Sequence, residues 1–150
     1  MTATSATVQT IPPAQTRPWR PAPGWPPPPS WIESARDTEK LDLAAATLRR
    51  YGIAVATSAP GAAEEAVDLL TDRVRSRFPE ADGACVVWTA SDAARCVDPA
   101  GGLCHPLPVH TRGPGVTEAA VAAFGRAGLG VTPGDEPGVV LVHTPGDPRV

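Results

Sequence analysis

Residues 84–90, with the sequence ACVVWTA, form a short apolar run that ends at Ser91-Asp92. A run of this length, rich in valine and bounded by turn residues, predicts a β-strand. Since nearly every position is apolar, both faces of this strand need to be covered, as in the interior of a sheet. The rest of the fold is therefore predicted outward from this strand.

Two helices are predicted before this strand. The first begins near Asp37 or Thr38, because both residues are favourable N-caps, and ends near Tyr51. The second is predicted to be capped by Ser58 and to end before Pro79. Its predicted core face consists of apolar residues at helical spacing, namely Ala63, Val67, Leu70, Val74 and Phe78. Between the two helices, alternating apolar residues over 53–57 predict a short strand.

A β-hairpin is predicted after the central strand, with residues 98–102 as its loop. In this register Val97 opposes Leu103, and Cys96 opposes Cys104. Opposed residues of a hairpin have Cα atoms about 4.5–5.5 Å apart, which suits a disulfide. The two cysteines are therefore candidates for a redox switch, although a reducing compartment favours free thiols.

The return strand of the hairpin is predicted at a sheet edge, because Pro108 cannot donate a ladder hydrogen bond. A third helix follows from about Thr117, and a last strand covers residues 138–144. This order predicts an α+β fold, an N-terminal helix followed by a βαββαβ unit like the ferredoxin-like sandwich. We expect a single domain over residues 36–146, with a short C-terminal tail over residues 147–150.

The first 32 residues hold nine of the nineteen prolines and three of the four tryptophans, and they contain no acidic residue. Such a segment favours polyproline II, with three residues per turn. In that geometry Trp19, Trp25 and Trp31 share one face, because six residues make two turns. We expect residues 1–35 to be a disordered tail whose tryptophans dock a protein partner. The alternatives are incidental tryptophans or tryptophans that fold back on the body.

The charge of the chain is unevenly distributed. The first 32 residues carry Arg17 and Arg20, a net charge of +2, whereas the rest has eleven basic and sixteen acidic residues, a net charge of −5. Nucleic-acid binding depends on neutralising phosphates, so this distribution argues against it. No apolar run is long enough to span a membrane, and no secretory signal pattern is present. With only three cysteines, a cytoplasmic protein is expected.

Motifs of catalysis are missing from the sequence: it contains no GxSxG, no P-loop, no GxGxxG after a strand and no HExxH. An enzyme is therefore less expected than a non-enzymatic module, and no cofactor is predicted. The group Cys96, Cys104, His105 and His110 lacks the paired spacing of zinc ligands, so no metal is predicted. His143 is expected to be a sheet histidine with satisfied hydrogen bonds.

Three functions are left open by the sequence. The first is an interaction or regulatory module that docks a protein partner, or a second copy of itself, through a sheet face and the tryptophan-bearing tail. The second is a sensor of a small anionic metabolite at the N-terminus of the third helix, with Arg112, Gly113 and Gly115 as ligand-binding residues. The third is a thiol switch formed by Cys96 and Cys104.

Overall fold

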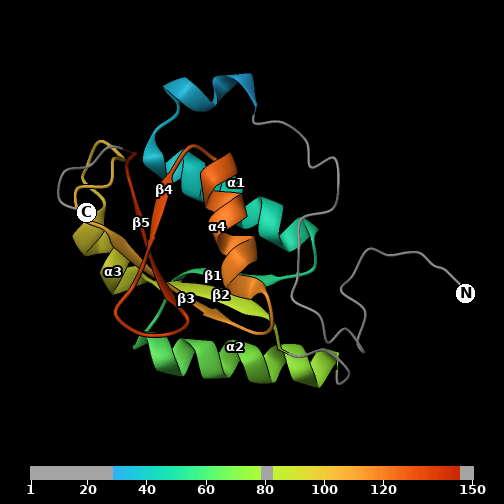
Figure 1. Ribbon diagram of the computed structural model, residues 1–150. Coiled ribbons are helices and arrows are strands. Elements are labelled where there is room, and N and C mark those ends of the chain that lie inside the picture. The colour runs from blue at the N-terminus through green and yellow to red at the C-terminus, as the bar shows by residue number, and fades with distance from the viewer. Residues whose placement is uncertain (1–28, 79–82, 146–150) are drawn as a thin grey trace, which may run out of the picture.

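The computed structural model describes residues 29–78 and 83–145 of the chain. These residues form a five-stranded mixed sheet and its covering helices, which confirms an α+β fold (Figure 1). The helices are the 3-10 helix η1 (Ser30–Ser34), α1 (Asp37–Arg50), α2 (Ala63–Arg77), α3 (Ala90–Cys96) and α4 (Val116–Arg126). The strands are β1 (Ala54–Ala59), β2 (Cys85–Thr89), β3 (Leu107–Arg112), β4 (Gly130–Pro133) and β5 (Val139–His143).

The strand order of the sheet is β1-β2-β3-β5-β4. β1 and β2 are parallel and joined through α2, whereas every other neighbouring pair is antiparallel. α1 packs beside α4 on one face of the sheet, and α2 lies on the opposite face (Figure 1). The ferredoxin-like order is not confirmed, because the described residues form five strands in a different order with helices on both faces.

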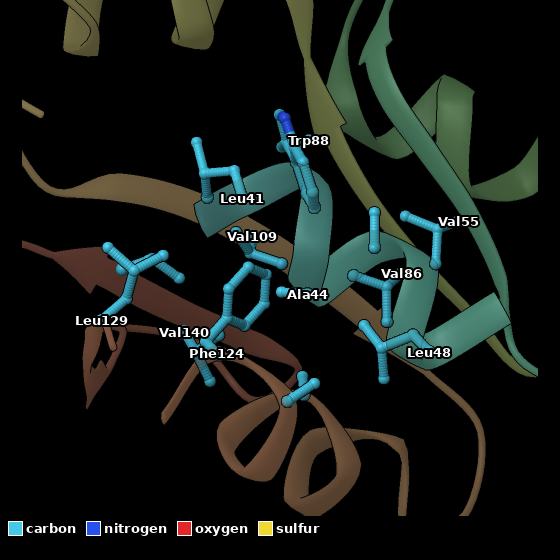
Figure 2. Close-up of a cluster of buried hydrophobic side chains, with 14 of the residues drawn as sticks. Leu41, Ala44, Leu48, Val55, Val86, Trp88, Val109, Phe124, Leu129 and Val140 are labelled. Carbon is cyan, nitrogen blue, oxygen red and sulfur yellow. The ribbon is translucent and has the colours of Figure 1, made fainter. Parts of the chain in front are cut away.

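β2 confirms the strand predicted over residues 84–90, and all five of its residues are buried. Val86 and Trp88 belong to the large core under α1 and α4, whereas Cys85 and Val87 belong to a smaller cluster under α2. The Trp88 and Phe124 rings lie 5.9 Å apart, tilted by 58°. Figure 2 shows how side chains of α1, the strands and α4 converge in this core. The continuous apolar sequence of β2 thus reflects burial on both faces.

α1 begins at Asp37, close to the predicted position, but its N-cap is Arg36. The Arg36 backbone N–H donates to Glu39 Oε1 at 3.0 Å, which is one half of a capping box. This backbone hydrogen bond is the main reason why the pKa of the Glu39 carboxyl lies below its usual value. The predicted capping role of Asp37 or Thr38 is therefore wrong.

α2 begins at Ala63, and the prediction that Ser58 caps it is wrong. Ser58 lies in β1 with a φ of 57°, at an irregularity in the register with β2. The buried residues of α2 are Ala66, Val67 and Thr71. Phe78, predicted in the core, is 57% exposed. Phe78 is the C-cap of α2, with a φ of −133° and a ψ of 75°, so it lies past the last helical residue and does not continue the buried face of the helix.

The predicted first strand of the hairpin is wrong, because residues 90–96 form the helix α3. The Thr89 hydroxyl accepts a hydrogen bond from the Asp92 N–H at 3.1 Å, which caps this helix. The predicted pairing of Val97 with Leu103 is confirmed as an isolated antiparallel bridge. The loop over residues 98–102 therefore forms as predicted, but it follows a helix.

The predicted edge position of the return strand is also wrong, because β3 lies between β2 and β5. The β2–β3 ladder ends at the pair Val87–His110, before it reaches Pro108. Pro108 pairs only with Leu141 of β5. The proline is accepted in an interior strand because the β2–β3 ladder has already ended at that level, so no donor is needed toward β2.

Candidate functional site

The sheet face on the α2 side is only partly covered. The apolar cluster beneath α2 contains residues of β1, α2 and β2 alone: Ala59, Ala66, Val67, Cys85 and Val87. β3, β5 and β4 continue this face beyond the cluster. Their alternate residues Val109, Val131, Val140 and Val142 belong to the core on the other side. The face on the α2 side therefore carries the residues between them.

These residues define what we call the open face: Pro108, His110, Thr132, Val139 and Leu141. They pair across the strands, Pro108 and Thr132 both with Leu141, and His110 with Val139. Each side chain is partly buried, and none belongs to the cluster under α2. The result is a mainly apolar surface without an acidic residue, held on rigid paired strands.

Both edges of the sheet carry features that oppose strand addition. On β4, the Gly134 N–H donates to the Val139 carbonyl at 2.9 Å, so the backbone of the preceding Pro133 faces outward. Proline has no N–H to offer a new strand there. On β1, the carbonyl of Val55 faces outward and accepts a hydrogen bond from Arg49 Nη2 at 3.0 Å. Strand addition is therefore hindered at one position on each edge of the sheet.

Trp31 lies in η1 and is 46% exposed, while the adjacent Ile32 is buried. Polyproline II geometry therefore does not extend to Trp31, because this residue is part of a 3-10 helix. Trp19, Trp25 and the predicted C-terminal tail at 147–150 lie outside the described residues. Residues 30–34, which the sequence places in the tail, form the first helical turn of the described structure.

The three residues predicted to bind an anion have structural roles. Arg112 Nη1 donates to Asp68 Oδ1 at 2.8 Å and to the Thr71 hydroxyl at 3.3 Å, so its guanidinium lies against α2. Gly113 has a φ of 113°, and a Cβ there would lie 3.0 Å from the Ala84 Cα. Gly115 is the N-cap of α4, with a φ of 73°. The structure thus directs Arg112 to an acidic partner on α2.

Cys96 and Cys104 are joined through their backbones, and both thiols are free. The Cys104 N–H donates to the Cys96 carbonyl at 2.8 Å, and the Cys104 Sγ–H donates to the same oxygen at 3.2 Å. Cys96 Sγ instead donates to the Pro106 carbonyl at 3.3 Å and lies in the main core. Burial raises the pKa of the Cys96 thiol, and Asp92 adds to this effect while Arg95 opposes it. Cys96 is therefore a poor nucleophile in the native state.

The buried carboxylate of Asp37 connects three parts of the fold. Asp37 Oδ2 accepts hydrogen bonds from the Leu103 N–H and the Thr144 hydroxyl, both at 2.8 Å. Lys40, the single lysine of the chain, places Nζ 4.0 Å from Asp37 Oδ1. Sequence reasoning missed this cluster because the partners of Asp37 are 66 and 107 residues away.

His143 is only partly satisfied, contrary to the prediction. Its Nδ1 lies 3.0 Å from the Thr144 carbonyl oxygen, which can only accept, so Nδ1 carries the proton. Nε2 is buried and has no hydrogen-bond partner among the described residues. The ring lies over Gly130, its cross-strand neighbour, where a Cβ would overlap the imidazole. Glycine at position 130 is therefore required by the volume of the His143 ring.

Within residues 29–78 and 83–145, no three His, Cys, Asp or Glu side chains are arranged to hold a metal ion. No helix in these ranges is long and apolar enough to cross a membrane. Comparisons of the chain with protein-family models, with curated proteins and with solved structures find no match in any of the three.

Proposed function

We propose that the protein is a small non-enzymatic interaction module that docks a protein partner through the open face and its tryptophan-bearing N-terminal segment. The observation that carries this proposal is the mainly apolar, partly exposed surface over β3, β5 and β4, which lies outside the apolar cluster under α2. The blocked edges of β1 and β4 support docking on the face rather than by strand addition.

The composition of the open face suits a protein interface. Val139 and Leu141 supply an apolar centre, and His110 and Thr132 supply polar groups at its border. The strands hold these side chains in place before binding, so little conformational entropy is lost. Trp31, which is 46% exposed, adds an aromatic side chain of the kind that is enriched at binding hot spots.

The test begins by identifying the partner through the face itself. A photoreactive side chain introduced at Thr132 in the full chain cross-links whatever docks there, and the same group at Ser76, exposed on α2, is the control. The affinity of the purified partner is then measured against Leu141→Asp and against Leu69→Asp, since Leu69 is 59% exposed on α2. We expect about tenfold weaker binding for Leu141→Asp, or about 1.4 kcal/mol, and unchanged binding for Leu69→Asp. Equal binding of both variants contradicts the proposal.

The N-terminal segment is tested by substitution in the full chain. Trp19→Ala, Trp25→Ala and Trp31→Ala are each compared with Val8→Ala in the same segment. Weaker partner binding for the tryptophan variants supports their role, because removal of a hot-spot tryptophan commonly costs about 2 kcal/mol or more. Identical affinities for all four variants assign docking to the open face alone.

A further inference from the structure

We propose that the outer surface of α2 pairs with the same surface of a second copy of the chain, with the two helices antiparallel. This goes beyond the proposed function, because it uses none of the residues of the open face. Three features of α2 carry the proposal: an exposed leucine near its middle, charges that the helix does not pair within itself, and a row of residues that is complementary to its own copy.

The outer surface of α2 carries an exposed apolar side chain. The helix packs on β1, β2 and β3, and among the described elements it is the outermost layer on its side of the sheet (Figure 1). Leu69, near the middle of α2, is 59% exposed, more than any other large apolar side chain of the described residues. A single exposed leucine is common on protein surfaces and selects no partner by itself. The charges around Leu69 therefore decide which partner fits.

The charged side chains of α2 are separated by sign along the helix. All of its acidic residues precede all of its basic residues, in the order Glu64, Glu65, Asp68, Asp72, Arg73, Arg75 and Arg77. The helix dipole favours this order only within the first and last turns, so it does not account for Asp68, Asp72 and Arg73. Like charges also repeat at four-residue spacing, from Asp68 to Asp72 and from Arg73 to Arg77, which destabilises a helix. An antiparallel second copy supplies the opposite charges.

One row of α2 is complementary to its own copy. Glu65, Leu69 and Arg73 follow one another at intervals of four residues, so they form a single ridge along the helix. All three are exposed, and neither Glu65 nor Arg73 forms an ion pair with another described residue. With a twofold axis at Leu69, the two leucines meet, and Glu65 of each copy faces Arg73 of the other. A parallel arrangement instead places like charges together, so the row selects the antiparallel pair.

The first experiment measures sedimentation velocity of the full chain from about 10 μM to about 1 mM, because an interface of one helix row is small and its dimer is weak. We expect dimers to form as the concentration rises. Glu65→Arg and Arg73→Glu each weaken the dimer about tenfold or more, since twofold symmetry turns one substitution into two like-charge contacts. The control is Glu64→Arg, the same change of charge about 100° away around the helix, which changes the affinity less than about threefold.

Recombining the two charge reversals tests the pairing itself. In a chain that carries both Glu65→Arg and Arg73→Glu, each new arginine again faces a glutamate of the other copy, so we expect dimerisation to return. A mixture of the two single variants also associates, because one copy then carries two arginines on the row and the other carries two glutamates. A parallel arrangement fails the first of these tests, since the double reversal still places like charges together.

Cross-linking locates the twofold axis. Leu69→Cys is introduced in a Cys104→Ser background, since Cys85 and Cys96 are buried. We expect a disulfide-linked dimer after mild oxidation with copper phenanthroline, because the axis places the two introduced thiols in contact. Ser76→Cys, also exposed on α2, is the control. In the antiparallel pair the two copies of this position lie about 21 Å apart along the helix axes, too far for a disulfide.

Three results overturn the proposal. A wild-type chain that stays monomeric over the whole concentration range shows that α2 does not pair. Equal effects of Glu65→Arg and Glu64→Arg show that net charge, and not the row, governs association. Equal cross-linking of Leu69→Cys and Ser76→Cys shows that the axis does not lie at Leu69. None of these results alters the expected partner affinity of Leu141→Asp, so failure here is distinguishable from failure of the proposed function.

Discussion

At the scale of single residues, Asp37 shows how one carboxylate can hold separate segments together. It lies in the first turn of α1, where a negative charge is favourable, and binds the loop before β3 and the residue after β5. Lys40 in the next turn balances its charge. The cluster therefore fixes the ends of three elements that are distant in sequence.

We expect Asp37→Ala to lower the free energy of unfolding by about 2–3 kcal/mol, because it leaves the Leu103 N–H and the Thr144 hydroxyl without their acceptor. Urea unfolding measures this change. Asp42→Ala, at an exposed position of the same helix, changes stability by less than about 0.5 kcal/mol. Equal stability of the two variants contradicts a role for Asp37 in joining the segments.

Gly130 and His143 form a coupled pair that double-mutant analysis can test. Gly130→Ala forces the imidazole to move and lowers stability by about 1–3 kcal/mol. In a His143→Ala background the same substitution has little effect, because the ring is gone. Gly125→Ala is the control, since no atom lies within 4 Å of the added Cβ in α4. This control stabilises the protein by about 0.5–1 kcal/mol through helix propensity.

The three thiols are expected to differ in reactivity and in their effect on stability. Burial raises the pKa values of Cys85 and Cys96, so only the partly exposed Cys104 is alkylated in the native protein. In the unfolded chain the Cys85 and Cys96 thiols release their protons from about pH 8.5, whereas the native state keeps them. The contribution of these two buried thiols to stability is therefore complete below about pH 8.5 and falls as the pH rises through their native pKa values.

Urea unfolding between about pH 8 and pH 9.5 measures this decline, and it becomes smaller in Cys96→Ala. Mass spectrometry after alkylation identifies the reactive thiol. A disulfide between Cys96 and Cys104 after treatment with oxidised glutathione favours the thiol switch instead. A native protein that shows equal alkylation of all three cysteines contradicts the predicted order.

At the scale of elements, both edge strands of the sheet carry a feature that hinders strand addition. β1 is covered at Val55 by the Arg49 guanidinium, and β4 is short and ends at Pro133. Exposed edges with free N–H and carbonyl groups are templates for strand addition. Arg49 and Pro133 therefore hinder the addition of a strand from another molecule at the two edges of the sheet.

We expect Pro133→Val combined with Arg49→Ala to increase concentration-dependent association, because the double variant exposes an N–H on β4 and a carbonyl on β1. Sedimentation velocity at increasing concentration measures the change. The control is Pro137→Val combined with Arg50→Ala, two exposed positions that lie outside both edge strands. Association of the control to the same extent would falsify the edge argument.

At the scale of the whole molecule, local patterns predict the covered strand and the helices, but not the sheet order. β2, α1 and α4 follow from apolar spacing and helix-end signals, which depend on residues close in sequence. The hairpin predicted after β2 is wrong because Thr89 is a helix N-cap, so the residues after it form α3. Pro108 wrongly indicates an edge strand, because its position inside the sheet depends on where the β2–β3 ladder ends.

The residues of the candidate site could not be predicted from the sequence. A sheet face is predicted as a docking surface by the sequence, but its residues depend on which strands α2 covers, and that is a tertiary property. Arg112 is a clear example of the difference. Its position before a glycine-rich helix start suggests an anion site, whereas Asp68, 44 residues away, takes its guanidinium.

The single lysine of the chain has a practical consequence for its chemistry. Lys40 keeps only 14% of its side chain exposed beside Asp37. Amine-directed reagents and enzymes that conjugate modifiers to lysine therefore find one shielded lysine side chain, because every other Lys/Arg position of the chain is an arginine. Acylation of Lys40 removes the charge that balances Asp37, so covalent labelling at this amine reports on the opening of the first turns of α1.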